Sequence, residues 1–327
     1  MKLSTERQVS VANAGQGEDC PRLPCLRVMS SFWRHPLRRE LSFSDPYRSA
    51  KRVFNRVRNH LLPKRARCSS LCRELVSERI GLEIGGPSEA FSKKGILPVY
   101  PYVKSLDNSN FSAETIWQGK IERGMTFRYD KKKPLGNQYL SEATNLQSIP
   151  SKTYDLVLSS HVLEHVANPL LALSEWRRVL KEDGFLFLVI PRRDGTFDHR
   201  RPVTSLGHLI RDFEQQMAEG DLTHLSEILL LHDLERDPAA GTWEAFKKRS
   251  RRNLENRCLH HHVFDAELVA QILAHMNLQV SVIEAVLPYH IVAIAQKTIS
   301  RNGCSRATCL GARKPIPNLK KFDEYIC

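Results

Sequence analysis

Long hydrophobic runs are missing from this chain of 327 residues. The longest apolar stretch, Phe185 to Ile190, is far shorter than the roughly 20 residues that a transmembrane helix needs. The N-terminus lacks the apolar core of a secretory signal, and Glu6, Glu18 and Asp19 are atypical of a transit peptide. We therefore expect a cytoplasmic protein without a transmembrane segment.

Closely paired cysteines are also missing. None of the eight cysteines forms a C-x-x-C pair, and only Cys258 lies in the part of the chain that we expect to fold as the core. Zinc sites and disulfide frameworks both show characteristic cysteine spacings. The pattern favours scattered reduced thiols, which agrees with a cytoplasmic protein.

The middle of the chain has no excess of one charge. The net charge is +13, but residues 1–79 carry +10 and residues 297–327 carry +5, which leaves −2 for residues 80–296. Recognition of a nucleic-acid backbone needs a basic face on the fold. We therefore expect a basic, partly helical extension over 1–79, with a helix near 47–67, a folded domain over 80–296, and a basic tail over 297–327. Nucleic acid is not the expected partner, although basic tails can contact RNA or an anionic membrane surface.

Apolar runs that break into small or polar residues predict the strands of the domain. They cover residues 82–84, 99–106, 139–143, 154–160 and 185–190. Strands that alternate with helices predict right-handed βαβ units and a mostly parallel sheet. Because the runs are continuous rather than alternating, we expect helices on both faces of that sheet. The predicted fold class is α/β.

Helix signals follow the fourth strand. Asn168 suits an N-cap, Pro169 the first helical position, and Gly184 a position just past the helix end. Residues 192–262 then form an insertion with two helical patterns, at 206–217 and 222–229. A further helix over 265–276 and a closing strand pair over 278–286 and 289–295 complete the predicted domain.

A turn of two glycines follows the first strand, at Gly85 and Gly86. Glycine permits positive φ and the close approach of a ligand to the backbone. The free N–H groups of such a turn suit an anionic group. A nicotinamide dinucleotide is disfavoured, because Pro87 stands where its fingerprint requires the second glycine.

The most specific segment is Ser159-Ser160-His161-Val162-Leu163-Glu164-His165, followed by Asn168-Pro169 and by Arg178-Val179-Leu180-Lys181-Glu182-Asp183-Gly184-Phe185. With these motifs, residues 80–296 resemble the class I S-adenosylmethionine-dependent methyltransferases, especially small-molecule enzymes of the type 11 kind. The resemblance implies a Rossmann-like fold with a helical insertion after strand five. It also implies S-adenosylmethionine as the cofactor.

The resemblance further implies cofactor contacts at the ends of four strands. They are Glu83, Gly85 and Gly86 at the methionine part, Asp107 at the ribose, Glu142 and Ala143 at the adenine, and Ser160 and His161 at the reactive end. Carboxylates accept hydrogen bonds from ribose hydroxyls and from the adenine amino group. Glu164 and His165 are expected to hold the turn after the fourth strand.

Acceptor chemistry is expected in the insertion, which begins at the carboxyl edge of the sheet. Methyl transfer to oxygen needs positioning and a base, and histidine has a suitable pKa. His199 is the leading candidate for the base, with His261 and His262 next, while Arg200 and Arg201 are expected to bind an anionic group of the substrate. In an alternative hypothesis a divalent cation binds to the same segment, with ligands from Asp198, His199, Asp233 and the run His260–His262.

The predicted function is therefore transfer of a methyl group to an oxygen, or less readily a nitrogen, of a small molecule such as a sugar or a natural product. Two alternatives remain open: a methyltransferase-like binding protein without turnover, and an RNA methyltransferase. The sequence predicts no oligomeric state.

Overall fold

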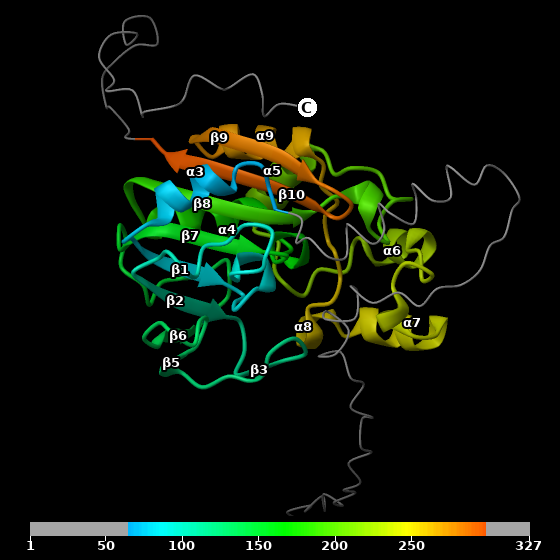
Figure 1. Cartoon of the computed structure of the whole chain (residues 1–327). Helices are drawn as coiled ribbons and strands as arrows, with labels where there is room; N and C mark the ends of the chain where they lie inside the picture. The colour runs from blue at the N-terminus through cyan, green and yellow to red at the C-terminus, as the bar shows by residue number, and fades with distance from the viewer. Residues whose placement is uncertain (1–64, 299–327) are drawn as a thin grey trace, which may run out of the picture.

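The computed structural model describes residues 65–298 (Figure 1). Within this range an eight-stranded sheet has the order β5-β6-β2-β1-β7-β8-β10-β9. Its strands are β1 Ile80–Ile84, β2 Ser105–Asn110, β5 Gly124–Phe127, β6 Gly136–Leu140, β7 Tyr154–Ser160, β8 Leu180–Pro191, β9 Leu278–Val286 and β10 His290–Lys297. A small second pair joins β3 Glu114–Thr115 to β4 Gly119–Lys120.

The centre of the sheet is parallel. β1 pairs in parallel with β2 on one side and β7 on the other, β2 continues to β6, and β7 to β8. β10 pairs antiparallel with β8 and with β9, as a closing hairpin. From β1 the chain therefore builds the sheet outward on one side, through β2 and β6, and then on the other side, through β7 and β8. In α/β sheets, ligands bind at the carboxyl ends of the strands beside the point where the strand order reverses, here between β1 and β7. The predicted α/β class with a mostly parallel sheet is confirmed.

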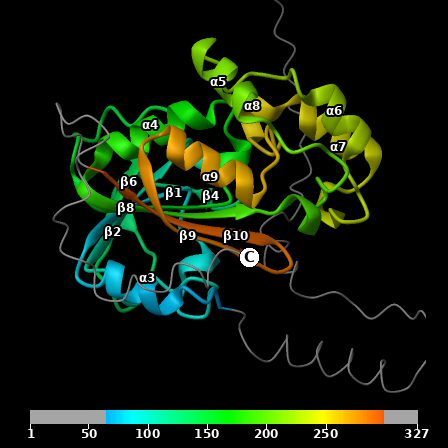
Figure 2. The same cartoon turned by 90° about the horizontal axis from the view of Figure 1, so that it is seen from above.

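Both faces of the sheet are covered (Figure 2). On one face α4 Pro169–Val179 and α9 Ala266–His275 pack on side chains such as Leu82 and Leu186. On the other face lies α3 Ser69–Val76, whose Cys72 is fully buried. The folded body therefore begins before residue 80, earlier than the predicted domain boundary. The predicted helix over 47–67 lies largely outside the described residues.

The second strand was predicted in the wrong place. Residues 99–104 form a buried turn, in which Tyr100 and Val103 pack under the sheet, and the strand is the more polar segment Ser105–Asn110. Its polar character has a physical reason, since Asn108 and Asn110 hydrogen-bond to the backbone of the glycine loop. The third strand was likewise predicted three residues too late, because β6 spans Gly136–Leu140.

The helix after β7 begins as predicted. The Asn168 side chain accepts a hydrogen bond from the Leu171 N–H, and Pro169 is the first helical residue. The helix ends at Val179, however, and β8 begins at Leu180, so the predicted end near Gly184 is wrong. Long-range contacts decide this, because the carbonyls of Val179 and Leu180 accept hydrogen bonds from the Thr153 N–H and from Lys297 Nζ.

Most of the insertion lies beyond the arrowheads of β1, β2 and β7 (Figure 1), whereas its first helix packs against α4 and α9. It holds α5 Leu206–Glu214, α6 Leu225–Leu231, α7 Trp243–Arg251 and α8 Asn253–Asn256. The first two agree with the predicted helical patterns, and α7 and α8 were not predicted. A small core of its own contains Ile228, Phe246 and Leu259.

Short 3₁₀ helices complete the described chain: η2 Glu89–Phe91, η3 Leu163–His165, η4 Arg193–Gly195 and η5 Pro238–Ala240. No helix between residues 65 and 298 is long and apolar enough to cross a membrane. Within the same range Cys68, Cys72 and Cys258 form no disulfide.

Candidate active site

Four neighbouring strands, β6, β2, β1 and β7, end along one edge of the sheet. Gly85 directly follows β1, Asn110 ends β2, Glu142 comes two residues after β6, and His161 directly follows β7. Because these strands are parallel, their carboxyl ends lie at the same edge. The glycine turn, Glu142 and His161 therefore all lie at this edge of the sheet.

The glycine loop packs tightly inside the protein. Gly85 has φ +79°, and a Cβ there would lie 2.6 Å from Val162 Cγ2, in the segment after β7. The Gly85 N–H donates to the Ser109 carbonyl and the Gly86 N–H to Asn108 Oδ1. The Ser88 N–H donates to Glu83 Oε1. Contrary to the prediction, these N–H groups are already paired and do not offer an open anion cradle.

Glu83 lies beneath that loop with no exposed surface. The Tyr100 hydroxyl donates to its carboxylate at 2.8–2.9 Å, and the Ser88 N–H donates at 3.0 Å. Burial nevertheless raises the pKa of Glu83 to about 8, against the opposing effect of these two donors. Glu83 is therefore largely protonated near neutral pH.

The raised pKa predicts a pH-dependent difference between the wild type and Glu83→Gln. Between the ordinary pKa of 4.5 and the folded value of about 8, the unfolded chain releases the Glu83 proton while the folded protein keeps it. The free energy of unfolding of the wild type therefore falls relative to that of the variant as pH rises, with a slope of up to ~1.4 kcal/mol per pH unit. Urea unfolding of both proteins from pH 4.5 to 8 measures this difference in the free energy of unfolding. Glu267→Gln, which replaces an exposed carboxylate, is the control and should show no such slope. A difference between the wild type and Glu83→Gln that does not change with pH would contradict the raised pKa of Glu83.

Asp107 does not end its strand. It is the third residue of β2 and pairs with Leu82. Its carboxylate accepts hydrogen bonds from the Tyr154 hydroxyl and the Asn137 N–H, both at 2.7 Å. Tyr154 is the first residue of β7, so this carboxylate is directed toward the opposite edge of the sheet. The expected acid at the end of strand two is therefore not there, and Asn110 holds that position.

Glu142 is joined to the insertion. Its Oε1 lies 2.6 Å from Arg257 Nη2, and Arg257 Nη1 lies 2.6 Å from Glu219 Oε2. Burial raises the pKa of Glu142, while the Arg257 charge acts in the opposite direction. The same guanidinium lies 5.2 Å from the ring centroid of Phe111, just after β2. Arg257 thus ties the insertion across the ends of β6 and β2, a role that no sequence motif indicated.

The neighbouring Ala143 contributes through its backbone. Its carbonyl accepts a hydrogen bond of 2.9 Å from Trp176 Nε1, which fixes the loop after β6 to α4. The Ala143 side chain is buried. Ser160, at the other predicted position, is the last residue of β7 and is half-buried.

His161 has φ +53°, an unusual conformation for a residue other than glycine. Its Nε2 lies 2.9 Å from His290 Nδ1, and its Nδ1 lies 3.4 Å from Glu164 Oε1. Burial and the nearby His161 lower the pKa of His290 to about 3. His290 is therefore neutral, and it fixes the His161 ring at the end of β7. The sequence did not single out His290.

In the insertion, His199 and Arg200 are accessible. His199 Nε2 lies 2.8 Å from Asp233 Oδ2, with a quarter of the His199 side chain exposed. Arg200 Nη2 lies 3.4 Å from the same oxygen, with half of its side chain exposed. The hydrogen bond from His199 keeps the pKa of Asp233 low, against its slight desolvation. His199 and Asp233 thus form a histidine–carboxylate pair with a partly exposed imidazole ring.

Arg201 and His261 are buried instead. Arg201 donates to Asp198, Glu227 and the carbonyls of His260 and His261, with 1% of its side chain exposed. His261 Nε2 is paired with Asn253 Nδ2, again at 1% exposure. The predicted substrate contact of Arg201 is therefore wrong, because its guanidinium is already used within the fold. His261 likewise has no face to a substrate.

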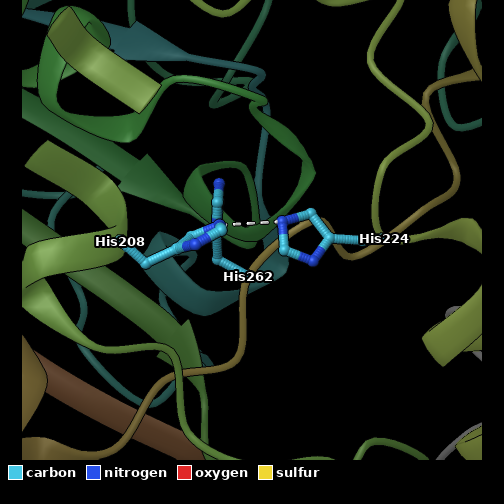
Figure 3. A group of neighbouring side chains, drawn as sticks. All are labelled: His208, His224 and His262. Carbon is cyan, nitrogen blue, oxygen red and sulfur yellow. Dashed lines mark hydrogen bonds between the residues drawn. The ribbon is translucent and has the colours of Figure 1, made fainter. Parts of the chain in front are cut away.

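His262 belongs to a group of three histidines with His208 and His224 (Figure 3). His208 Nε2 and His224 Nε2 lie 3.0 Å apart, and Arg211 lies 3.4 Å from His208 Nδ1. His262 Nε2 lies 3.1 Å from the Ala167 carbonyl. Burial lowers the pKa of His262 well below its usual value, so it stays neutral. The hydrogen bond between His208 and His224, with the contact of Arg211, explains why these two rings lie together.

Comparison with protein families identifies the segment at this edge of the sheet. The family model described as "Methyltransferase domain" matches residues 111–188, which run from the end of β2 into β8. The matched segment is less than half of the chain, and it is similar to a methyltransferase domain. No curated protein matches this chain.

Several solved methyltransferases are similar in fold. The CurJ carbon methyltransferase has 13% identity and a TM-score of 0.37; the match covers 68% of this chain and 49% of that one, about half its length. An S-adenosylmethionine-dependent methyltransferase from Aquifex aeolicus has 14% identity, a TM-score of 0.38, and coverages of 78% and 100%. The 1,6-didemethyltoxoflavin-N1-methyltransferase from Burkholderia thailandensis, with bound S-adenosylhomocysteine, has 10% identity, a TM-score of 0.38, and coverages of 80% and 94%.

The carboxyl ends of these strands form a polar edge of the kind at which α/β sheets bind ligands. Polar groups from Asn110, Glu142 and His161 lie beside the point where the strand order reverses, where α/β sheets bind ligands. The positive φ of Gly85 keeps the chain close to the segment after β7.

Proposed function

We propose that this protein is a methyltransferase that transfers the methyl group of S-adenosylmethionine to a hydroxyl oxygen of a small molecule. The observation that supports this proposal most directly is the His199–Asp233 pair in the segment that covers the strand ends. A hydroxyl must lose its proton as its oxygen is methylated, so a positioned base accelerates the reaction. Asp233 holds His199 Nε2, and His199 Nδ1 accepts the proton. A small molecule such as a sugar or a natural product is the proposed acceptor.

Two contacts between the insertion and the sheet support a location of this base near the strand ends. The Glu142–Arg257 ion pair ties the insertion to β6, and the His261 N–H donates to the Glu164 carbonyl after β7. In the proposal, Gly86, Asn110 and His161 border the cofactor. Arg200, with half of its side chain exposed, is the proposed contact for an anionic group of the acceptor.

Substitution of Gly86 tests the cofactor site. A Cβ at this position would lie 2.3 Å from Glu83 Cδ, so the loop and Glu83 must move apart. We expect Gly86→Ala to weaken S-adenosylmethionine binding at least ~10-fold, or about 1.4 kcal/mol. Titration calorimetry measures the affinity. Gly207→Ala is the matched control, because its Cβ would meet only Arg211 Nη1 at 3.9 Å on the exposed face of α5, and its affinity should equal that of the wild type.

A methyl-donor assay tests the reaction itself. The full chain is incubated with S-adenosylmethionine and a panel of hydroxylated metabolites, and mass spectrometry detects methylated products and S-adenosylhomocysteine. An O-methylated product supports the proposal. Methylation of amines alone, with none of alcohols, would refute the assignment of an oxygen acceptor.

One observation favours a second function, a methyltransferase-like protein that binds a ligand without turnover. The Glu142 carboxylate is already paired with Arg257, and the glycine-loop N–H groups are paired inside the protein. These contacts leave fewer groups for the cofactor. Calorimetric binding of S-adenosylmethionine with no product across the whole panel would distinguish this function from catalysis.

A further inference from the structure

A second group of metal-ligand side chains lies beside His161. Glu164 and His165 belong to η3, directly after β7, and His260 lies in the segment before α9. One ligand atom from each of the three lies within 4.8 Å of the others. Residues almost 100 positions apart in the chain thus meet at the edge of the sheet where the cofactor is expected.

Glu164 is the most unusual member of the group. Its side chain has no exposed surface, and neither carboxylate oxygen has a hydrogen-bond partner among the described residues. His161 Nδ1 and His165 Nε2 lie 3.4 and 3.9 Å from Oε1. Burial of a carboxylate without hydrogen bonds carries a large cost unless a cation compensates it. A metal ion bound to this oxygen supplies that cation.

Both histidines are held as metal ligands usually are. His165 Nδ1 lies 3.0 Å from the Leu259 carbonyl, and His260 Nδ1 lies 2.5 Å from Asp198 Oδ2. A carbonyl or carboxylate that accepts the N–H of one ring nitrogen leaves the other nitrogen with its lone pair. In both residues that nitrogen is Nε2. Asp198 is itself held by Arg201 Nη1 at 2.9 Å, so the orientation of His260 is fixed through a chain of buried contacts.

We propose that Glu164, His165 and His260 bind a divalent first-row transition-metal ion, with Nε2 of each histidine and a Glu164 oxygen as ligands. Two histidines and one carboxylate are a donor set that such ions favour, and three protein ligands leave coordination positions open. His165 is the most exposed of the three, at 16% of its side chain. The inference rests on the proposed function in one respect: at the open position the ion binds the acceptor oxygen and lowers its pKa.

The group of His208, His224 and His262 is the natural alternative location (Figure 3). His262 Nδ1 there is also buried without a partner. His208 and His224, however, are joined by a hydrogen bond, and Arg211 approaches the other nitrogen of His208. A cation such as Arg211 beside that ring opposes metal binding. The second group therefore provides a control within the same chain.

Metal binding is measured on the full chain without an affinity tag, in the absence of S-adenosylmethionine. After dialysis against a chelator, the protein is titrated with Zn²⁺, Co²⁺ or Mn²⁺, and the bound metal is counted by mass spectrometry. We expect one tight equivalent in the wild type. Glu164→Gln and His165→Gln should each weaken binding about 100-fold or more, and Asp198→Asn 10- to 100-fold through His260. His224→Gln should bind as the wild type does.

Two results would overturn the proposal: no tight binding of any of these ions by the wild type, or loss of the ion in His224→Gln with retention in Glu164→Gln. Circular dichroism reports whether each variant is folded. If the variants are unfolded, the wild-type titration still tests whether the chain binds one of these ions tightly. Calorimetry of S-adenosylmethionine with the chelated protein separates a failure of the metal site from a failure of the cofactor assignment.

Discussion

Replacement of Arg201 by methionine is expected to lower the free energy of unfolding by about 3–5 kcal/mol. The Arg201 guanidinium is buried and donates to Asp198, to Glu227 and to two backbone carbonyls. Burial opposes ionisation of Asp198, but its partners His260 and Arg201 lower its pKa to about 2, so removal of Arg201 takes away one of the two partners that stabilise the buried carboxylate. Removal of one member of a buried ion pair leaves the other uncompensated.

Arg200→Met is the matched control for that measurement. Arg200 is the adjacent residue and carries the same charge, but half of its side chain is exposed, and it lies 3.4 Å from Asp233. Exposed ion pairs contribute about 0–1 kcal/mol. Urea unfolding at neutral pH compares the two variants. Equal stabilities for Arg200→Met and Arg201→Met would mean that Arg201 is not buried as the structure has it.

His199→Gln is expected to reduce kcat about 10²- to 10⁴-fold, the range for loss of a general base. Glutamine keeps the size of the side chain and can still hydrogen-bond to Asp233, but it accepts no proton. Because His199 acts on the acceptor, we expect the affinity for S-adenosylmethionine to stay within a few-fold of the wild type. Steady-state kinetics with an O-methylated acceptor and calorimetry with the cofactor measure the two effects separately.

The control for His199→Gln is His275→Gln, at the exposed end of α9, which should leave kcat unchanged. Asp233→Asn should reduce kcat by less than His199→Gln, because it alters the orientation of the base and leaves the base in place. A wild-type kcat for His199→Gln would exclude this histidine as the base and remove the main support for an oxygen acceptor.

Local signals predicted much of the fold. The Asn168 and Pro169 start of α4 was predicted correctly because an N-cap and its proline act on adjacent residues. The parallel strands β1 and β7 were found because buried strands form continuous apolar runs. The second strand was misplaced because Val99 and Tyr100 are buried in a turn, and apolar runs mark burial whether or not they form a strand.

The residues of the candidate site also separate into those that local motifs predicted and those that depend on distant contacts. Gly85, Gly86, Glu142 and His161 lie at the strand ends where the motifs place them, and the histidine–carboxylate pair contains the leading candidate His199. Arg200 and Arg201 are adjacent and chemically alike, so the sequence had no means to distinguish the exposed residue from the buried one. His290, Arg257 and the grouping of Glu164 with His260 were missed, because each depends on residues far apart in the chain.

The sequence by itself determined the α/β class, the methyltransferase motifs and the position of the insertion after β8. Those features depend on short-range periodicity, on caps and on turns. Only the tertiary structure decided which charged and imidazole groups are buried and what each of them contacts. Burial and pairing depend on contacts between α8, η3, β7 and β10, which are distant in sequence, and the free energy of a buried charge depends on such contacts rather than on its neighbours along the chain.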